Sequence, residues 1–152
     1  MMEPSVLTIN VKIQIQKPVT EVYQAIIDPS KMANYFIAKG SDIMEQGKRL
    51  TWKFPEFDTE VPVLVGRLET DQYISFYWDE DDQYLVEFQL SPAKDQTSTL
   101  LAIAEKNVKN DTVDIDWLKR NTEGWANFAA CLKAYLEYGI NLRKGAFDFM
   151  KT

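Results

Sequence analysis

The stretch TEGWANFAACLKAYLEYGI, residues 122–140, decides the fold of this 152-residue chain. Apolar residues recur in it at three- and four-residue steps, which predicts a long amphipathic helix with one strongly apolar stripe. The pattern leaves two starts open, one near Thr122 and one through an earlier helical piece at 114–120. The predicted stripe consists of Trp125, Phe128, Ala129, Leu132, Leu136 and Ile140.

The residues before this helix alternate with period two. Residues 7–16 predict a strand with one buried face. Pro18 and the Asp28-Pro29 pair delimit two short helices, over 19–27 and 30–36. Further alternating runs, joined by short polar turns, predict an antiparallel meander of about six strands. These runs lie at 50–54, 61–65, 74–78, 84–90 and 99–103.

The order of these elements predicts an α+β fold in one domain over residues 1–152. We expect a curved antiparallel sheet of about six or seven strands, wrapped around the long C-terminal helix, with two short helices after the first strand. A sheet curled around a single covering helix can enclose a cavity instead of a fully packed core.

The composition excludes several kinds of chemistry. The chain has no histidine and one cysteine, Cys131, which excludes His-dependent nucleophiles, His-ligated metals, internal disulfides and iron–sulfur clusters. A net charge of −6 argues against a nucleic-acid partner. Residues 1–5 lack the features of a signal peptide, and no apolar run is long enough for membrane insertion. We therefore expect a cytoplasmic protein without a metal or cofactor.

Several motifs point to a known family. Val11–Ile15 leads into Pro18–Ile26, Asp28–Met32 precedes Tyr35-Phe36, Gly66–Glu69 precedes Ile74–Trp78, and Thr99–Leu101 leads on to Gly124-Trp125. From about Val11 to Tyr138, their order and spacing resemble the START-like (SRPBCC) superfamily with the helix-grip fold. Within it, the chain is most similar to the activator of heat-shock protein 90 ATPase homologue family.

The resemblance implies a cavity between the sheet and the long helix. Across the superfamily this cavity serves lipid transport, hormone sensing or polyketide cyclisation, so the fold does not fix the function. The chain departs from the family pattern at Tyr23 and Tyr35, where Trp is common, and in the short segment between Phe54 and Val61. These departures indicate a different cavity lining.

Large aromatic residues fall on the strand and helix faces that are predicted to meet inside. This arrangement is typical either of an ordinary packed core or of a pocket for an apolar small molecule or lipid. The candidate cavity lining consists of Trp52, Phe54, Phe76, Trp78, Phe88, Glu105, Trp125, Phe128 and Leu132.

Three candidates for chemistry each have an ordinary alternative. Glu105 continues the parity of an apolar strand face. It either points inward, with a raised pKa that suits an acid or base, or lies solvated at the strand end, which is the commoner outcome. The acidic turn at 79–82 lacks the spacing of a calcium loop and predicts a solvated turn. Cys131 predicts a packed or idle thiol, because the chain has no histidine to activate it and its mid-helix position is far from the N-terminal end of the helix dipole.

We consider three hypotheses for the function. The leading one is a non-enzymatic domain, without a recognisable catalytic set, that binds a small hydrophobic ligand or assists a chaperone in the stress response. The second is an interaction module that acts on the heat-shock chaperone ATPase, as the family resemblance implies. The third is an enzyme of the polyketide cyclase or hydrolase type, with Glu105 or Tyr77 as its acid–base group. The oligomeric state is left open.

Overall fold

Seven strands form one antiparallel sheet in a computed structural model that describes residues 7–110 and 114–151. The order across the sheet is β1-β7-β6-β5-β4-β3-β2, so the later strands form a meander and β1 pairs with β7. Residues 1–5, on which the signal-peptide expectation depends, lie outside the described residues. The strands are β1 (Ile9–Ile15), β2 (Lys39–Gly40), β3 (Arg49–Lys53), β4 (Glu60–Glu69), β5 (Tyr73–Trp78), β6 (Tyr84–Pro92) and β7 (Thr99–Asn107).

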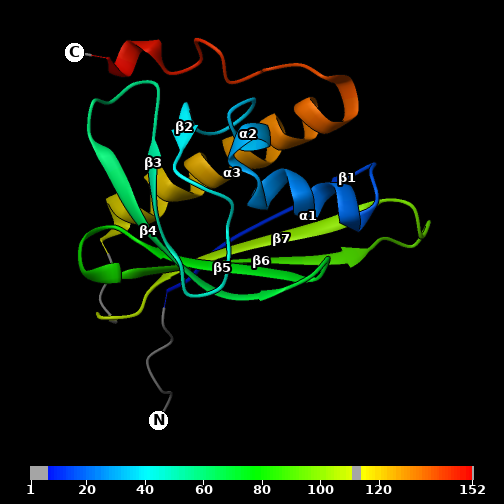
Figure 1. Cartoon of the computed structure of the whole chain (residues 1–152), viewed down its shortest axis with the longest axis horizontal. Helices are drawn as coiled ribbons and strands as arrows, with labels where there is room; N and C mark the ends of the chain where they lie inside the picture. Colours follow the sequence, from blue (N-terminus) through cyan, green and yellow to red (C-terminus); the bar gives the residue numbers. More distant parts are fainter. Residues whose placement is uncertain (1–6, 111–113, 152) are drawn as a thin grey trace.

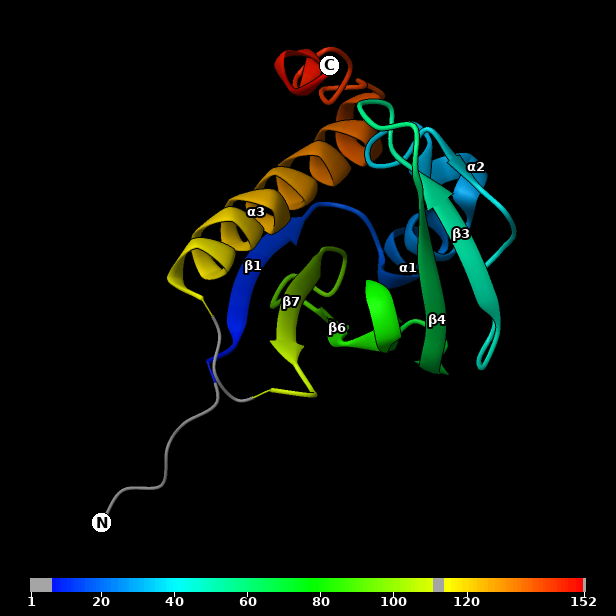
Figure 2. The ribbon, with the colours of Figure 1, turned by 90° about the vertical axis from the view of Figure 1, so that its left-hand side faces the viewer.

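Helices cover one side of this sheet. The sheet curves around α1 and the long helix α3, as the views in Figures 1 and 2 show. This arrangement confirms the predicted α+β helix-grip fold. No helix in the described ranges is long and apolar enough to cross a membrane. The helices are α1 (Val19–Ile27), α2 (Pro29–Met32) and α3 (Ile115–Tyr138), with short 3-10 turns at η1 (Glu80–Asp82) and η2 (Asp148–Met150).

The two ends of α3 differ from the simplest interpretation of the sequence pattern. The helix begins at the earlier of the two predicted starts, where the Asp114 carboxylate caps it by accepting from the Asp116 N–H. It ends at Tyr138 because Gly139 adopts a left-handed backbone conformation with φ 67°. Ile140 was expected on the apolar stripe, which is wrong, because it follows the helix and is 52 % exposed.

The second short helix is also shorter than predicted. The pattern predicts it over 30–36, whereas α2 ends at Met32 and the chain continues as a turn. Tyr35 and Phe36 nevertheless face the interior, since their rings lie 5.4 Å and 4.7 Å from the ring of Phe128.

The core forms where the inner face of the sheet meets α1 and α3. Strand parity is followed closely in β7, where every second residue from Thr99 to Asn107 is buried. Rings from the strands and α3 contact one another, for example Phe88 stacked on Phe128 at 5.5 Å. This packing fixes the position of α3 over the sheet.

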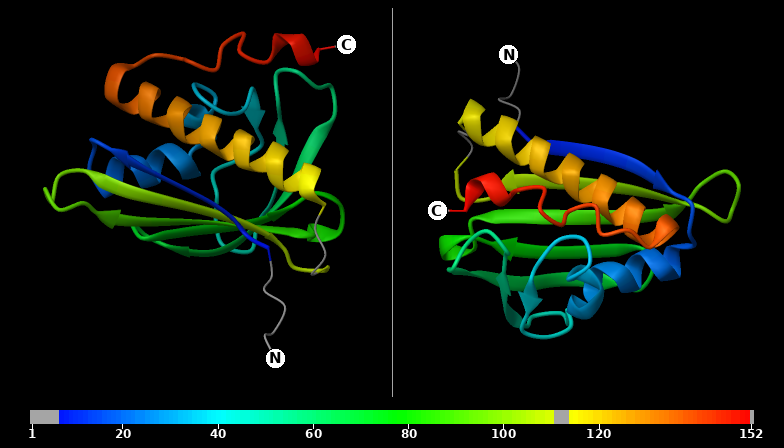
Figure 3. Two further views of the ribbon diagram at one scale, coloured as in Figure 1. Left: turned by 180° about the vertical axis from the view of Figure 1, so that it is seen from behind. Right: turned by 90° about the horizontal axis from the view of Figure 1, so that it is seen from above.

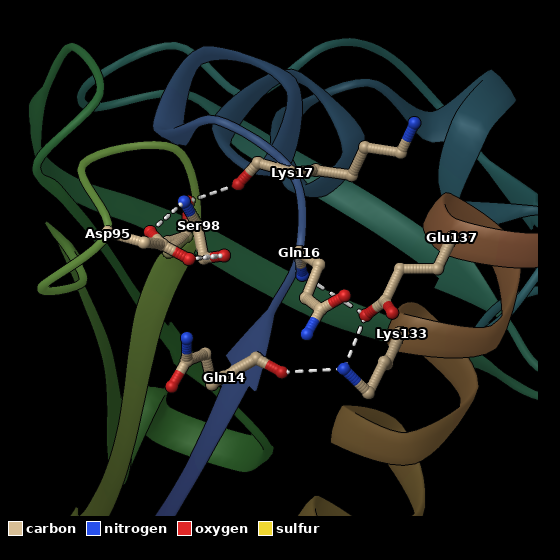
Figure 4. Close-up of polar contacts among 8 residues, drawn as sticks. Gln14, Gln16, Lys17, Asp95, Ser98, Lys133 and Glu137 are labelled. Atoms are coloured by element: carbon tan, nitrogen blue, oxygen red, sulfur yellow. Dashed lines mark hydrogen bonds and ion pairs between the residues drawn. The ribbon is translucent and has the colours of Figure 1, made fainter.

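Polar contacts attach α3 to the edge strand β1. Lys133 donates from its Nζ to the Gln14 carbonyl at 2.8 Å, and the Gln16 N–H donates to the Glu137 carboxylate at 3.1 Å. Lys133 and Glu137 also form an ion pair with each other (Figure 4). These side chains satisfy one backbone group of β1 and one of Gln16, which directly follows the strand. They therefore hold the helix that forms one wall of the site described next.

Candidate functional site

An aromatic pocket of about 450 Å³ opens between α3, the β3–β4 connection at 54–59 and the C-terminal segment at 139–151. Nine of its eighteen lining residues are aromatic, and most of the others are polar residues of α3 and the two flanking segments. The aromatic residues are Tyr35, Phe36, Phe54, Phe57, Trp78, Trp125, Phe128, Phe147 and Phe149.

The structure separates the predicted cavity residues into two layers. Phe54, Trp78, Trp125 and Phe128 line the pocket. The others lie beneath it, because periodicity gives the face of a strand or helix on which a side chain lies but not the position of that side chain along the element. These deeper residues are Trp52, Phe76, Phe88, Glu105 and Leu132, each at most 1 % exposed.

The deeper residues support the pocket wall from below. The ring of Phe88 lies 5.7 Å from that of Trp125, and the ring of Trp52 lies 6.4 Å from that of Trp78. The aromatic interior is therefore both a packed core and the base of a pocket. The sequence pattern had presented these as two alternatives.

Glu105 is the buried charged group of this region, with no exposed surface. Its carboxylate accepts hydrogen bonds from Trp78 Nε1 at 2.7 Å, Trp125 Nε1 at 2.8 Å and Asn121 Nδ2 at 3.0 Å. Burial raises the pKa of Glu105, while the three hydrogen bonds oppose that rise. The alternative of a solvated strand end is therefore wrong. The early start of α3 contributes to this outcome, since it brings Asn121 into the helix, from which Asn121 and Trp125 both donate to Glu105.

The C-terminal segment contributes pocket residues that the sequence pattern did not indicate. It folds back beside α3 and lies between that helix and the β3–β4 connection (Figure 3, right). Phe147, Phe149 and Met150 from this segment line the pocket. The segment has no helical or strand period, so the only sequence signal was the recurrence of large apolar residues after Gly139.

A buried ion pair ties this segment to the β3–β4 connection. Arg143 donates from Nη1 and Nη2 to the two carboxylate oxygens of Glu56, at 3.1 Å and 2.8 Å. The two side chains are only 14 % and 4 % exposed. The guanidinium also lies 5.0 Å from the centre of the Phe147 ring. This two-pronged geometry fixes the C-terminal segment across the mouth of the pocket.

The remaining candidate residues differ in whether they line the pocket. Tyr77 does not line it, and Glu105 is separated from it by two indoles. Cys131 lines the pocket, and burial raises the pKa of its thiol. In the acidic turn, Asp82 pairs with Arg49 at 2.8 Å. Within residues 7–110 and 114–151, no group of three or more His, Cys, Asp or Glu could hold a metal ion.

Fold and pocket together define a helix-grip domain of the START-like superfamily. The sequence profile of the family described as "Activator of Hsp90 ATPase homolog 1-like protein" matches residues 16–137, and the chain belongs to this family. A comparison with curated proteins finds no match.

Solved structures with the same fold include proteins from several bacteria. Protein SSP2350 from Staphylococcus saprophyticus is 30 % identical, with a TM-score of 0.78 over 90 % of this chain and 96 % of that chain. The Aha1 dimer from Colwellia psychrerythraea is 20 % identical, with a TM-score of 0.75 over 88 % and 98 %. DynU16, a putative protein in the dynemicin biosynthetic locus, is 23 % identical, with a TM-score of 0.77 over 88 % and 48 %.

Proposed function

We propose that this domain binds a small apolar molecule in the aromatic pocket between the sheet and α3. The observation that supports the proposal best is the pocket itself, in which nine aromatic rings surround about 450 Å³. Small-molecule sites commonly measure roughly 300–1,000 Å³ and combine apolar walls with a few polar groups. Aromatic rings provide large contact surfaces at a low cost in conformational entropy.

The C-terminal segment supports the same proposal. It contributes Phe147 and Phe149 to the wall, and the Arg143–Glu56 ion pair anchors it over the pocket. A ligand held beneath this segment is shielded from water on the side that the sheet and α3 leave open. The lining carboxylate of Glu56 is held in its ion pair with Arg143, which favours binding over turnover in this proposal.

Gly124 offers a direct test because it lies in α3 and lines the pocket. A Cβ added there meets no atom within 4 Å, so a larger side chain can project into the open space. Replacing a glycine inside a helix also stabilises the helix by roughly 0.5–1 kcal/mol. Gly124→Leu should therefore fold at least as stably as the wild type while it blocks the pocket. Gly124→Ala is the matched control, with the same gain in helix stability and little added volume.

The experiment combines native mass spectrometry of gently purified protein with a thermal-shift panel of hydrophobic probes. We expect an apolar molecule to bind the wild type and Gly124→Ala but not Gly124→Leu. The proposal fails if nothing co-purifies and the panel is flat, or if Gly124→Leu binds the same probes with unchanged affinity.

We propose a chaperone-accessory role in the cytoplasm as the second candidate function. It rests on the family description and on exposed apolar side chains of the C-terminal segment, such as Leu142 at 53 % and Phe149 at 82 % exposed. Exposed apolar surface of this kind suits contact with a protein partner. A steady-state ATPase assay of the heat-shock chaperone, with and without this domain, tests the idea. An unchanged rate at saturating concentrations would exclude it.

A further inference from the structure

Glu105 is a buried carboxylate without a cationic partner. Its three hydrogen-bond donors, the indoles of Trp78 and Trp125 and the amide of Asn121, are all neutral. The ion pairs found among the described residues do not include it. Three N–H groups directed at two oxygens match an ionised carboxylate, which only accepts hydrogen bonds. The region beneath the pocket therefore carries a negative charge that hydrogen bonds stabilise but do not neutralise.

Two indole rings separate this charge from the pocket. Trp78 and Trp125 both line the pocket, and their ring centres lie 5.5 Å apart with the planes inclined by 35°. Each ring turns its N–H edge toward Glu105. Donation to an anion polarises the donor, and this increases the electron density of the indole. The face of an aromatic ring already carries negative potential and attracts cations.

The other charges at the pocket balance one another. Arg143 is fully engaged by both oxygens of Glu56. Arg120 and Glu123, the other charged lining residues, carry opposite signs on α3. The negative charge of Glu105 is not balanced in this way, and the nearby Asp79 adds to the negative potential around it. An ammonium group close to the two indoles would thus meet an attractive field, whereas an anion would be repelled.

We propose that the ligand of this pocket is an apolar molecule with an ammonium group, bound with its cation against Trp78 and Trp125 and its apolar body among the phenylalanine rings. The inference rests on the proposed ligand-binding function and gives it a chemical class. Glu105 acts in it as a specificity-determining residue that works through the two indoles.

Three probes with one aromatic body and different charges test this proposal. They are naphthylmethylammonium, naphthylmethanol and naphthoate, titrated at neutral pH by isothermal calorimetry into the wild-type protein. A cation on the face of a tryptophan gains enough free energy for the ammonium probe to bind about 2- to 30-fold more tightly than the alcohol. The carboxylate should bind most weakly of the three.

Glu105→Gln removes the charge and keeps the shape of the side chain. It should lower the preference for the ammonium probe over the alcohol, because the indole faces still attract the cation but the buried charge no longer adds to that attraction. The affinity for the alcohol should change little. Glu69→Gln is the matched control, because it removes an exposed carboxylate that does not line the pocket. This control should retain most of the preference, since its carboxylate faces solvent that screens it.

The outcomes separate this inference from the proposed function. If none of the three probes binds the wild type, the ligand-binding function itself is contradicted. If the alcohol or the carboxylate binds as tightly as the ammonium probe, the pocket is a ligand site but the cationic class is wrong. If Glu105→Gln does not fold, the comparison of the three probes on the wild type decides the inference alone.

Discussion

Replacing Glu105 by alanine should destabilise the domain more than any exposed acidic substitution. The change leaves three N–H donors without their acceptor. Trp125 is only 3 % exposed, so its N–H finds no water, and an unsatisfied buried donor costs about 1–3 kcal/mol. Trp78 and Asn121 are partly exposed and can recover some of their loss from solvent. We therefore expect a loss of about 2–4 kcal/mol in the free energy of unfolding.

Urea unfolding followed by tryptophan fluorescence measures this loss. Glu69→Ala is the control, because Glu69 is an exposed strand residue whose ion pair with Arg67 is open to water. Its effect should stay within about 0.5 kcal/mol, as is usual for a surface pair. The reasoning is refuted if Glu105→Ala and the wild type share the same urea midpoint, since Glu105 would then have no buried hydrogen bonds to lose.

The pH dependence of the same variants gives an independent check. Burial raises the pKa of Glu105 above its usual value of 4.5, so the folded state holds this proton more tightly than the unfolded state. Stability from this group is then fully present below the usual pKa and declines as the pH rises through the folded value. The deficit of Glu105→Gln relative to the wild type should shrink as the pH rises from about the usual value of 4.5 through the folded pKa. A deficit that grows over this range contradicts the burial of the carboxylate.

Three further predictions concern the surroundings of the pocket. Arg143→Met leaves the buried Glu56 carboxylate without its partner, so amide hydrogen exchange should rise in residues 141–151 but not in the middle of α3. Exchange rates in 141–151 equal to those of the wild type would contradict the anchoring role. Burial opposes ionisation of Glu137, but contacts that include the Lys133 ammonium outweigh it and lower the pKa of Glu137. Glu137→Gln should therefore destabilise the domain at neutral pH. The difference in urea midpoint from the wild type should vanish as the pH falls through the folded pKa. Gly124→Ala should raise the melting temperature through a gain of up to about 1 kcal/mol, and a lower one would show that the glycine is required.

Most of the fold could be predicted because it depends on periodic burial. The stripe through Trp125, Phe128 and Leu132 identified the long helix, and the alternation in β7 identified a half-buried strand. Short polar turns between such runs left little choice other than an antiparallel meander. Local periodicity therefore carried enough information to define both layers of the structure.

The pocket could be predicted only in part because two of its determinants are not periodic. The C-terminal segment is held by contacts such as the pair between Arg143 and Glu56, which lie 87 residues apart in the sequence. No local pattern indicates such a contact. The environment of Glu105 depends on where α3 begins, which was fixed by the Asp114 cap and not by the apolar stripe.

The four tryptophans provide the most direct test of ligand binding in the pocket. Trp78 and Trp125 line it, Trp52 lies beneath it, and Trp117 stacks on Tyr84 at 5.1 Å without lining it. Their indole N–H signals can be followed separately by NMR while naphthylmethylammonium is added. The account predicts that the signals of Trp78 and Trp125 shift in a saturable way and that the signal of Trp117 does not move. A shift of Trp117 alone, or no shift with any of the three naphthyl probes, would contradict it.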